Sequence, residues 1–141
     1  MKRDVLLDTG PLVAFLNRRD AYCDWASQQW RQIAPPLLTC EAVISEACFL
    51  LGETKGRGDA VVQLLERGVI RIPFHIEDHI QSVKKLLVKY QSVPISLADA
   101  CLVRMSELHS SSHVLTLDSD FNVYRKHGRQ IIPTIMPDRD K

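Results

Sequence analysis

Short apolar segments alternate with longer amphipathic ones along this sequence, and the alternation constrains the fold more than any other feature. The apolar segments have the length of strands and occupy residues 5–7, 37–38, 69–74, 113–118 and 129–136. The intervening segments have helical periodicity and begin near residues 11, 21, 40, 59, 76 and 97. Strands separated by helical stretches of this length are typical of βαβ units. The sequence therefore predicts an α/β fold, a three-layer α/β/α sandwich around a parallel sheet.

The size and composition are those of an ordinary globular protein. With 141 residues, 45% hydrophobic and 25% charged, we expect a single domain over residues 1–141. The net charge of +1 gives no electrostatic argument for nucleic acid. Because no signal peptide or membrane-length apolar run is apparent, we expect a cytoplasmic protein with no membrane association. Its four cysteines form no Cys-x-x-Cys pair and are expected to be reduced: Cys23, Cys40, Cys48 and Cys101.

Two aspartates stand at the ends of apolar strands. Asp8 follows residues 5–7, and Asp118 follows the buried-looking run at 114–117. Strand interiors disfavour Asp, and ligands bind at the carboxyl ends of strands in open parallel sheets. Thr9 is predicted to cap the helix that follows the first strand. A turn is the alternative explanation at the second site, and for Asp120 we prefer it.

A glutamate on the predicted helix at 40–51 raises a related question. With Glu41 at zero on a helical wheel, Glu46 falls at roughly 140°, among Phe49 and Leu50, and is predicted to face the protein. The alternative, at even weight, is a boundary residue whose stem packs while its carboxylate reaches water. The helix is predicted to end at Gly52.

The helix after Ser96 carries the fourth acid of interest. Asp99 lies at the margin of its apolar side, beside Val103 and Ser106. Ser96 and Asp99 fit a capping box, with Ser96 as N-cap, and on this helix alone we favour that role. The two roles are compatible, because a carboxylate in the first turn can still point towards the sheet edge.

Taken together, these acids predict a metal site. Four carboxylates gathered without cations repel one another strongly, and no Lys or Arg lies within four residues of Asp8. Such clusters are tolerated where they hold a hard divalent cation, and Mg²⁺ and Mn²⁺ prefer oxygen ligands. A metal held in this way can make a nucleophile from water and stabilise a phosphoryl oxygen.

Four segments that contain these acids, "LLDTGPLVAFL", "AVISEACFLL", "SLADACLV" and "VLTLDSDF", resemble the acidic motifs of PIN-domain ribonucleases. The likeness is greatest to the VapC-type toxins of toxin–antitoxin pairs. It implies a five-stranded parallel sheet with the first and fourth strands adjacent, and a Mg²⁺- or Mn²⁺-dependent endoribonuclease. The positions that match the family's acidic quartet are Asp8, Glu46, Asp99 and Asp118. The positions that match its supporting residues are Thr9, Thr116 and Asp120. Relatives often carry His where this chain has Cys23.

The resemblance also implies roles and partners. Asp8, Asp99 and Asp118 are the expected metal ligands, direct or through water, and Glu46 completes the shell or orients the attacking water. The expected partners are an RNA substrate, a small cognate antitoxin and a second copy of the chain in a homodimer. An early aromatic cluster, Tyr22, Trp25 and Trp30, is expected to lie under the antitoxin, although both Trp residues could equally be core. The basic residues that could contact RNA are Lys84, Lys85, Lys89, Arg104, Arg125, Lys126 and Arg129.

Three other interpretations fit less well. A strand-end-Asp phosphatase needs a second Asp where this chain has Gly10, and a phospho-receiver needs an Asp at the end of its third strand, which reads "IRIPF". His75 and His79 have zinc-like spacing, but no third ligand is apparent, and a polar helix start is preferred. A PIN fold retained as a non-catalytic binding module is the remaining alternative, and the intact quartet argues against it.

Overall fold

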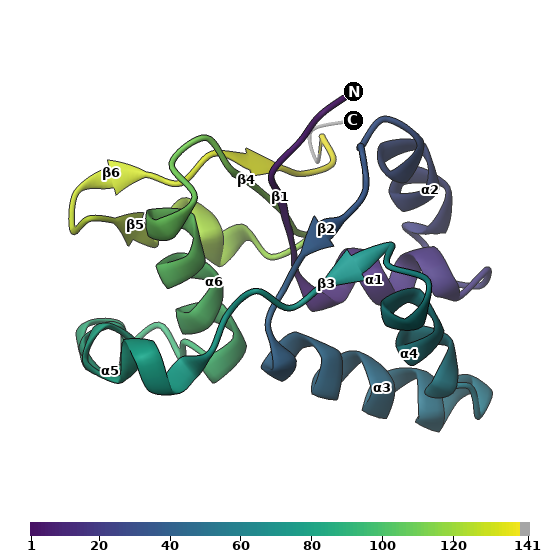
Figure 1. The fold of residues 1–141 in the computed structure, drawn as a ribbon, viewed down its shortest axis with the longest axis horizontal. Helices are drawn as coiled ribbons and strands as arrows, with labels where there is room; N and C mark the ends of the chain where they lie inside the picture. Colours follow the sequence, from purple (N-terminus) through teal and green to yellow (C-terminus); the bar gives the residue numbers. More distant parts are fainter. Residues whose placement is uncertain (139–141) are drawn as a thin grey trace.

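The computed structural model describes residues 1–138 and contains a five-stranded sheet in which all pairings are parallel (Figure 1). The strands lie in the order β3 (Ile70–Arg71), β2 (Leu37–Leu38), β1 (Val5–Leu7), β4 (His113–Leu115) and β7 (Thr134–Ile135). The α/β fold with a central parallel sheet is therefore confirmed, and so is the adjacency of the first and fourth strands.

Helices flank the sheet. Four of them lie on the right-hand side and along the lower edge of the view in Figure 1: α1 (Thr9–Leu16), α2 (Cys23–Arg31), α3 (Glu41–Lys55) and α4 (Asp59–Glu66). On the left lie α5 (Ile80–Lys89), preceded by the 3₁₀ turn η1 (Ile76–His79), and α6 (Leu97–Leu108). A second 3₁₀ turn, η2 (Ser119–Asn122), leads into a small antiparallel hairpin of β5 (Arg125–Lys126) and β6 (Gln130–Ile131).

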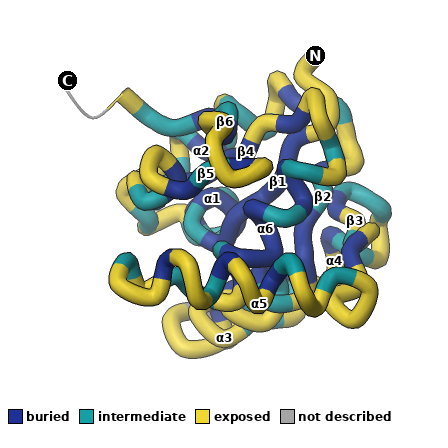
Figure 2. The backbone as a smooth tube through the Cα atoms, turned by 90° about the vertical axis from the view of Figure 1, so that its left-hand side faces the viewer, coloured by how far each residue is buried: buried dark blue, intermediate teal, exposed yellow. Residues whose placement is uncertain are grey.

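The central strands are buried on both faces, as their uninterrupted apolar sequences require. Val5, Leu6 and Leu7 of β1 are at most 1% exposed, and α6 packs against β1 and β4 with most of its residues buried. Figure 2 shows this centre in dark blue, while α3 and α5 expose their outer faces. The β1–β4 register pairs Leu7 with Leu115, so the residues that follow, Asp8 and Thr116, emerge side by side at the carboxyl edge.

Several sequence-based boundaries were wrong. The strand predicted at 113–118 is only the three residues of β4, and the helix predicted from residue 76 begins as the 3₁₀ turn η1. Helix α3 continues through Gly52, which is exposed and tolerated there, and ends at Lys55, before Gly56. Gly56 has a φ of 65° and donates its backbone N–H to the Gly52 carbonyl, a left-handed cap that suits glycine. The segment at 69–74 forms only the two-residue strand β3, since Pro73 has no N–H to donate.

The last predicted strand is two strands. Gln130 and Ile131 pair antiparallel with β5, outside the main sheet, whereas Thr134 and Ile135 pair with β4. Pro133 stands between the two segments and accepts a hydrogen bond at its carbonyl from the Val114 N–H. Among residues 1–138, no helix has the length and apolarity that crossing a membrane would require.

Candidate active site

Asp8 begins the site at the carboxyl end of β1. It is 6% exposed, and its Oδ1 accepts a hydrogen bond of 2.8 Å from the Thr9 N–H, so Asp8 itself is the N-cap of α1. The prediction that Thr9 caps this helix was wrong, because Asp8 already has the extended backbone that an N-cap needs. Burial raises the pKa of Asp8 to about 6, against the hydrogen bonds from Thr116 and Thr9, which lower it; the nearby charges of Asp99 and Asp118 raise it further.

Thr116 connects the two strand ends. Its Oγ1 donates to Asp8 Oδ2 at 2.7 Å and accepts from the Asp118 N–H at 2.9 Å, and the side chain is fully buried. The register places Thr116 in the position equivalent to Asp8, and Asp118 follows two residues later. Asp118 instead caps η2, where its Oδ1 accepts from the Asp120 N–H at 2.8 Å.

Asp99 enters from the first turn of α6. The predicted capping box is confirmed: Ser96 Oγ accepts from the Asp99 N–H at 3.0 Å, and Asp99 Oδ2 accepts from the Ser96 N–H at 3.2 Å. The same Oδ2 accepts from the Tyr124 hydroxyl at 3.3 Å. Partial burial raises the pKa of Asp99, and the charge of Asp118 adds to that effect.

Tyr124 is a site residue that the sequence analysis did not identify. Its ring is fully buried and packs edge-on against Tyr90 and Phe121, with centroids 5.1 and 5.2 Å away. Burial is the largest cause that raises the pKa of its hydroxyl, followed by the charge of Asp99. The only available signal was that a buried Tyr needs a hydrogen-bond partner, which does not say which partner.

Glu46 reaches the site from the second turn of α3. The Thr9 Oγ1 donates to Glu46 Oε2 at 3.0 Å. The predicted protein-facing side of the helix was wrong, since Phe49 and Leu50 are 65% and 41% exposed and Glu46 is also exposed. The side of α3 that faces the core carries Val43, Ala47 and Leu51. Glu46 is thus a boundary residue whose carboxylate turns towards Thr9.

These side chains surround one open cavity of about 410 Å³. It is lined by Asp8, Glu46, Asp99 and Asp118, together with Thr9, Gly10, Ser96 and Leu117. Within the part of the chain that the structure describes, no Lys or Arg lines it. Gly10 allows the first turn of α1 to approach this edge, because a Cβ there would lie 3.2 Å from Leu117 Cδ1. Of the acids that match the family motifs, only Asp120 does not line the cavity.

The donor set of this cavity fits a hard, hydrated cation. Among residues 1–138, no three His, Cys, Asp or Glu side chains are grouped closely enough to hold a metal ion directly. Mg²⁺ keeps several waters and is typically bound by one or two carboxylates, so four carboxylates around a hollow of this size fit an ion held partly through water. At the His75–His79 pair, for which zinc was considered and a polar helix start preferred, His79 Nδ1 accepts from Arg104 Nε at 3.2 Å and its ring stacks on Phe74.

Comparison with known families gives one clear match. The sequence profile described as the PIN domain matches residues 5–127, so the chain belongs to the PIN domain family. This confirms the family that the four acidic motifs indicated. A search of curated proteins finds no match.

Solved structures agree on the fold. The VapC20 toxin of Mycobacterium tuberculosis, described as cleaving the sarcin–ricin loop, superposes with a TM-score of 0.77 and is 22% identical; the match covers 84% of this chain and 93% of that one. One chain of the VapBC2 structure from Rickettsia felis, which is bound to a DNA fragment from the promoter, superposes with a TM-score of 0.62 at 11% identity, covering 97% of this chain and 100% of that one. The fold of this chain is therefore the fold of these solved structures.

Proposed function

We propose that this protein is a Mg²⁺- or Mn²⁺-dependent endoribonuclease, and that it acts as the toxin of a toxin–antitoxin pair. One observation carries the proposal: four carboxylates from β1, α3, α6 and the β4–η2 connection face one cavity that no described Lys or Arg lines. The PIN domain match and the likeness to a toxin described as cleaving the sarcin–ricin loop support the same activity. We also propose that residues 1–141 form a single PIN domain.

The residues that would hold the cation are Asp8, Asp99 and Asp118, directly or through water. A bound Mg²⁺ or Mn²⁺ would activate water as a nucleophile and neutralise charge on a phosphoryl oxygen. Thr116 fixes the rotation of Asp8 through its 2.7 Å hydrogen bond, and Ser96 and Tyr124 fix that of Asp99. Such supporting hydrogen bonds keep carboxylates in a ligating orientation.

Glu46 has a separate role in the proposal. It is the most exposed of the four acids, and among residues 1–138 its side chain accepts one hydrogen bond, from Thr9. A carboxylate with free acceptor capacity at the rim of the cavity can orient the attacking water or take its proton. Asp120 lies outside the cavity and acts through its backbone N–H, which holds Asp118 at 2.8 Å.

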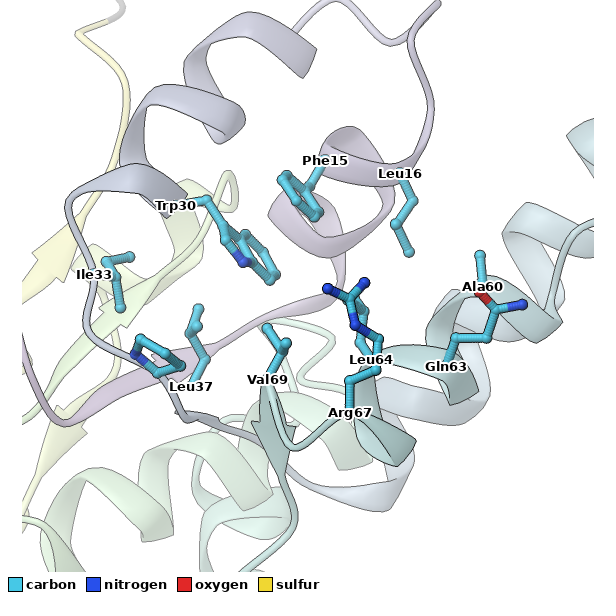
Figure 3. Close-up of a pocket in the computed structure, with 11 residues that line it drawn as sticks. Phe15, Leu16, Trp30, Ile33, Leu37, Ala60, Gln63, Leu64, Arg67 and Val69 are labelled. Carbon is cyan, nitrogen blue, oxygen red and sulfur yellow. The ribbon is translucent and has the colours of Figure 1, made fainter.

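The proposed partner is a small antitoxin, and the structure offers it an apolar cavity of about 420 Å³ between α1, α2 and α4 (Figure 3). Trp30 stacks on Phe15 with ring centroids 4.0 Å apart, and both rings line this cavity opposite Leu64 and Arg67. Trp25 and Trp30 are partly buried. Their burial is intermediate between that expected of core residues and that expected of exposed interface residues. We also propose that the protein forms a homodimer through another surface. Its proposed location is the cytoplasm, where RNA substrates occur.

The test is cleavage of RNA by the purified chain in Mg²⁺ or Mn²⁺, compared with EDTA. We expect cleavage only with the metal, and its loss in single Asn or Gln variants of the quartet. Glu41→Gln is the matched control, since Glu41 is also an exposed acid on α3 but lies outside the cavity. Absence of metal-dependent cleavage of any RNA, with normal folding, would favour the non-catalytic binding module instead.

A further inference from the structure

A second hollow, of about 280 Å³, lies between α5, the end of α6 and the β5–β6 hairpin. These three elements lie together on the left of Figure 1. Three cationic side chains line it: Lys85 and Lys89 come from α5, and Arg125 comes from β5. We call this hollow the basic groove. It is separate from the acidic cavity, with which it shares no lining residue.

The charge of the groove is not neutralised within the described chain. Lys89 Nζ donates to the Gly128 carbonyl at 3.2 Å and lies 5.2 Å from the centroid of the Tyr90 ring. Arg125 Nη1 donates to three carbonyls, those of Asn122, Val123 and Tyr124. All of these partners are neutral, so they orient the cations and leave their charge in place.

Glu107 is the one acid that lines the groove, and both of its carboxylate oxygens already accept hydrogen bonds. Glu107 Oε1 accepts from Arg104 at 3.1 Å, and its Oε2 accepts from the His127 backbone N–H at 2.7 Å. Neither of the two salt bridges over residues 1–138 involves Lys85, Lys89 or Arg125. The groove therefore presents three uncompensated positive charges to whatever enters it.

The structure also sorts the basic residues that could contact RNA. Arg104 is held by Glu107 and His79, and Lys126 is buried with its Nζ donating to the Ser110 carbonyl at 3.4 Å. Lys84 and Arg129 are exposed and do not line the groove. The remaining three candidates, Lys85, Lys89 and Arg125, are the ones that stand together.

Helix α6 and the segment around Tyr124 connect the groove to the cavity lined by the four carboxylates. Helix α6 carries Asp99 at its start and Glu107 near its end, about 12 Å apart along the axis at 1.5 Å per residue. Tyr124 donates its hydroxyl to Asp99, and the next residue, Arg125, donates its backbone N–H to the Tyr90 hydroxyl at 3.0 Å. A nucleic-acid strand of a few nucleotides can span this distance.

We propose that the basic groove binds a backbone phosphate of the RNA substrate, on a nucleotide that flanks the cleaved bond. This inference rests on the proposed ribonuclease function. Lys and Arg bind phosphate without reading sequence and fix the register of a nucleic acid on a protein. An acidic protein segment is the less suitable occupant, because the groove's one large apolar side chain, Leu86, is buried and protein interfaces are anchored by exposed aromatic and apolar groups.

The experiment measures binding of a fluorescently labelled, mixed-sequence single-stranded RNA by anisotropy, in EDTA, over a series of NaCl concentrations. We expect Lys85→Ala combined with Lys89→Ala to weaken binding at least ~10-fold and to reduce the salt slope by roughly 1–2. Lys84→Ala is the matched control, because it removes the same charge from the same helix outside the groove, and we expect it to bind as wild type does. Lys85→Ala alone leaves the hydrogen bond between Lys89 and Gly128 intact. It should reduce the salt slope by about half as much as the double variant does.

Wild-type binding by the double variant would overturn the proposal. An equal loss in Lys84→Ala would do the same, since it would show diffuse attraction and no defined groove. Loss of a co-purifying protein partner with RNA binding intact would assign the groove to that partner. Because EDTA removes any metal-dependent cleavage, this result stands apart from the nuclease assay: an inactive wild type that still binds RNA through the groove would contradict only the proposed activity.

Discussion

Thr116 and Asp8, 108 residues apart in the chain, are joined by a 2.7 Å hydrogen bond beneath the cavity that the four carboxylates line. The β1–β4 register brings them together. The Thr116 hydroxyl donates its one proton to Asp8, and its oxygen accepts from the Asp118 N–H. One hydroxyl thus positions two of the four carboxylates. In metal sites, partners of this kind orient the ligands and keep them ready to bind.

Thr116→Val should therefore weaken metal binding and cleavage roughly 10- to 100-fold while the fold is retained. Removal of the hydroxyl leaves Asp8 without a hydrogen bond that lowers its pKa and leaves the Asp118 N–H without its acceptor. Thr39→Val is the matched control: Thr39 is also fully buried, and its Oγ1 donates to the Leu7 carbonyl at 2.7 Å. It should cost about 1 kcal/mol of stability and leave Mn²⁺ affinity, measured by titration, unchanged. Equal effects of both variants on Mn²⁺ affinity would assign Thr116 a purely structural role.

Asp8→Asn should reduce cleavage at least ~100-fold, because it keeps the shape of the side chain and removes one anionic ligand. The measurement is the initial rate of RNA cleavage in saturating Mg²⁺ or Mn²⁺. Cleavage at the wild-type rate by a folded Asp8→Asn protein would remove Asp8 from the proposed site.

The sequence was most informative where the determinants are local. The alternation of apolar and amphipathic segments predicted the parallel α/β fold, and the Ser96–Asp99 spacing predicted the capping box that the structure contains. Capping boxes are readable because both partners lie within one helical turn. The acids that follow strand-like segments could also be identified from local sequence. Asp is depleted in strands, so an Asp next to an apolar run marks the point where the strand ends.

Relations across long sequence separations were not readable in this way. The Tyr124–Asp99 hydrogen bond joins a loop to a helix start, and no local pattern specifies it. Asp8 and Thr9 can both cap a helix, so only the backbone conformation decides between them. The helical wheel misplaced Glu46 because it assumed that Phe49 and Leu50 mark the buried side, whereas α3 buries Val43, Ala47 and Leu51 and leaves both large residues exposed.

Binding of the proposed antitoxin should change the fluorescence of Trp30. Its indole stacks on Phe15 and lines the apolar cavity between α1, α2 and α4, so a partner that fills the cavity would exclude water from it. We expect the protein from its native operon to co-purify with a small partner and to show shifted Trp emission relative to the isolated chain. Trp30→Phe should remove the shift in emission. Trp25 is the only other Trp and lies outside that cavity, so Trp25→Phe should preserve the shift. A chain that purifies alone from the operon and is a monomer by light scattering would count against both proposed protein partners.

The raised pKa of Asp8 should make the metal-free protein less stable as pH rises. The folded state holds the Asp8 proton up to about pH 6, whereas the ordinary pKa is 3.8. The proton on Asp8 therefore adds about 3 kcal/mol to the free energy of unfolding. This stabilisation is fully present below pH 3.8 and is lost as pH rises through about 6. We expect the stability difference between wild type and Asp8→Asn, from urea unfolding in EDTA at several pH values, to move in favour of Asp8→Asn between pH 4 and 7. A difference that is independent of pH would show that Asp8 is charged at little cost.

Metal binding should reverse this destabilisation. An ion that binds only the folded protein adds RT ln(1 + [L]/Kd), near 2.7 kcal/mol at a hundredfold excess over Kd. Mg²⁺ or Mn²⁺ should therefore raise the melting temperature of the wild type by more than NaCl of equal ionic strength does. In EDTA at neutral pH, Asp8→Asn and Asp118→Asn should melt no lower than wild type, because each removes a charge that repels its neighbours. If the metal shift is absent, or if both Asn variants are much less stable in EDTA, the carboxylates stabilise the fold through their hydrogen bonds and the cavity holds no metal.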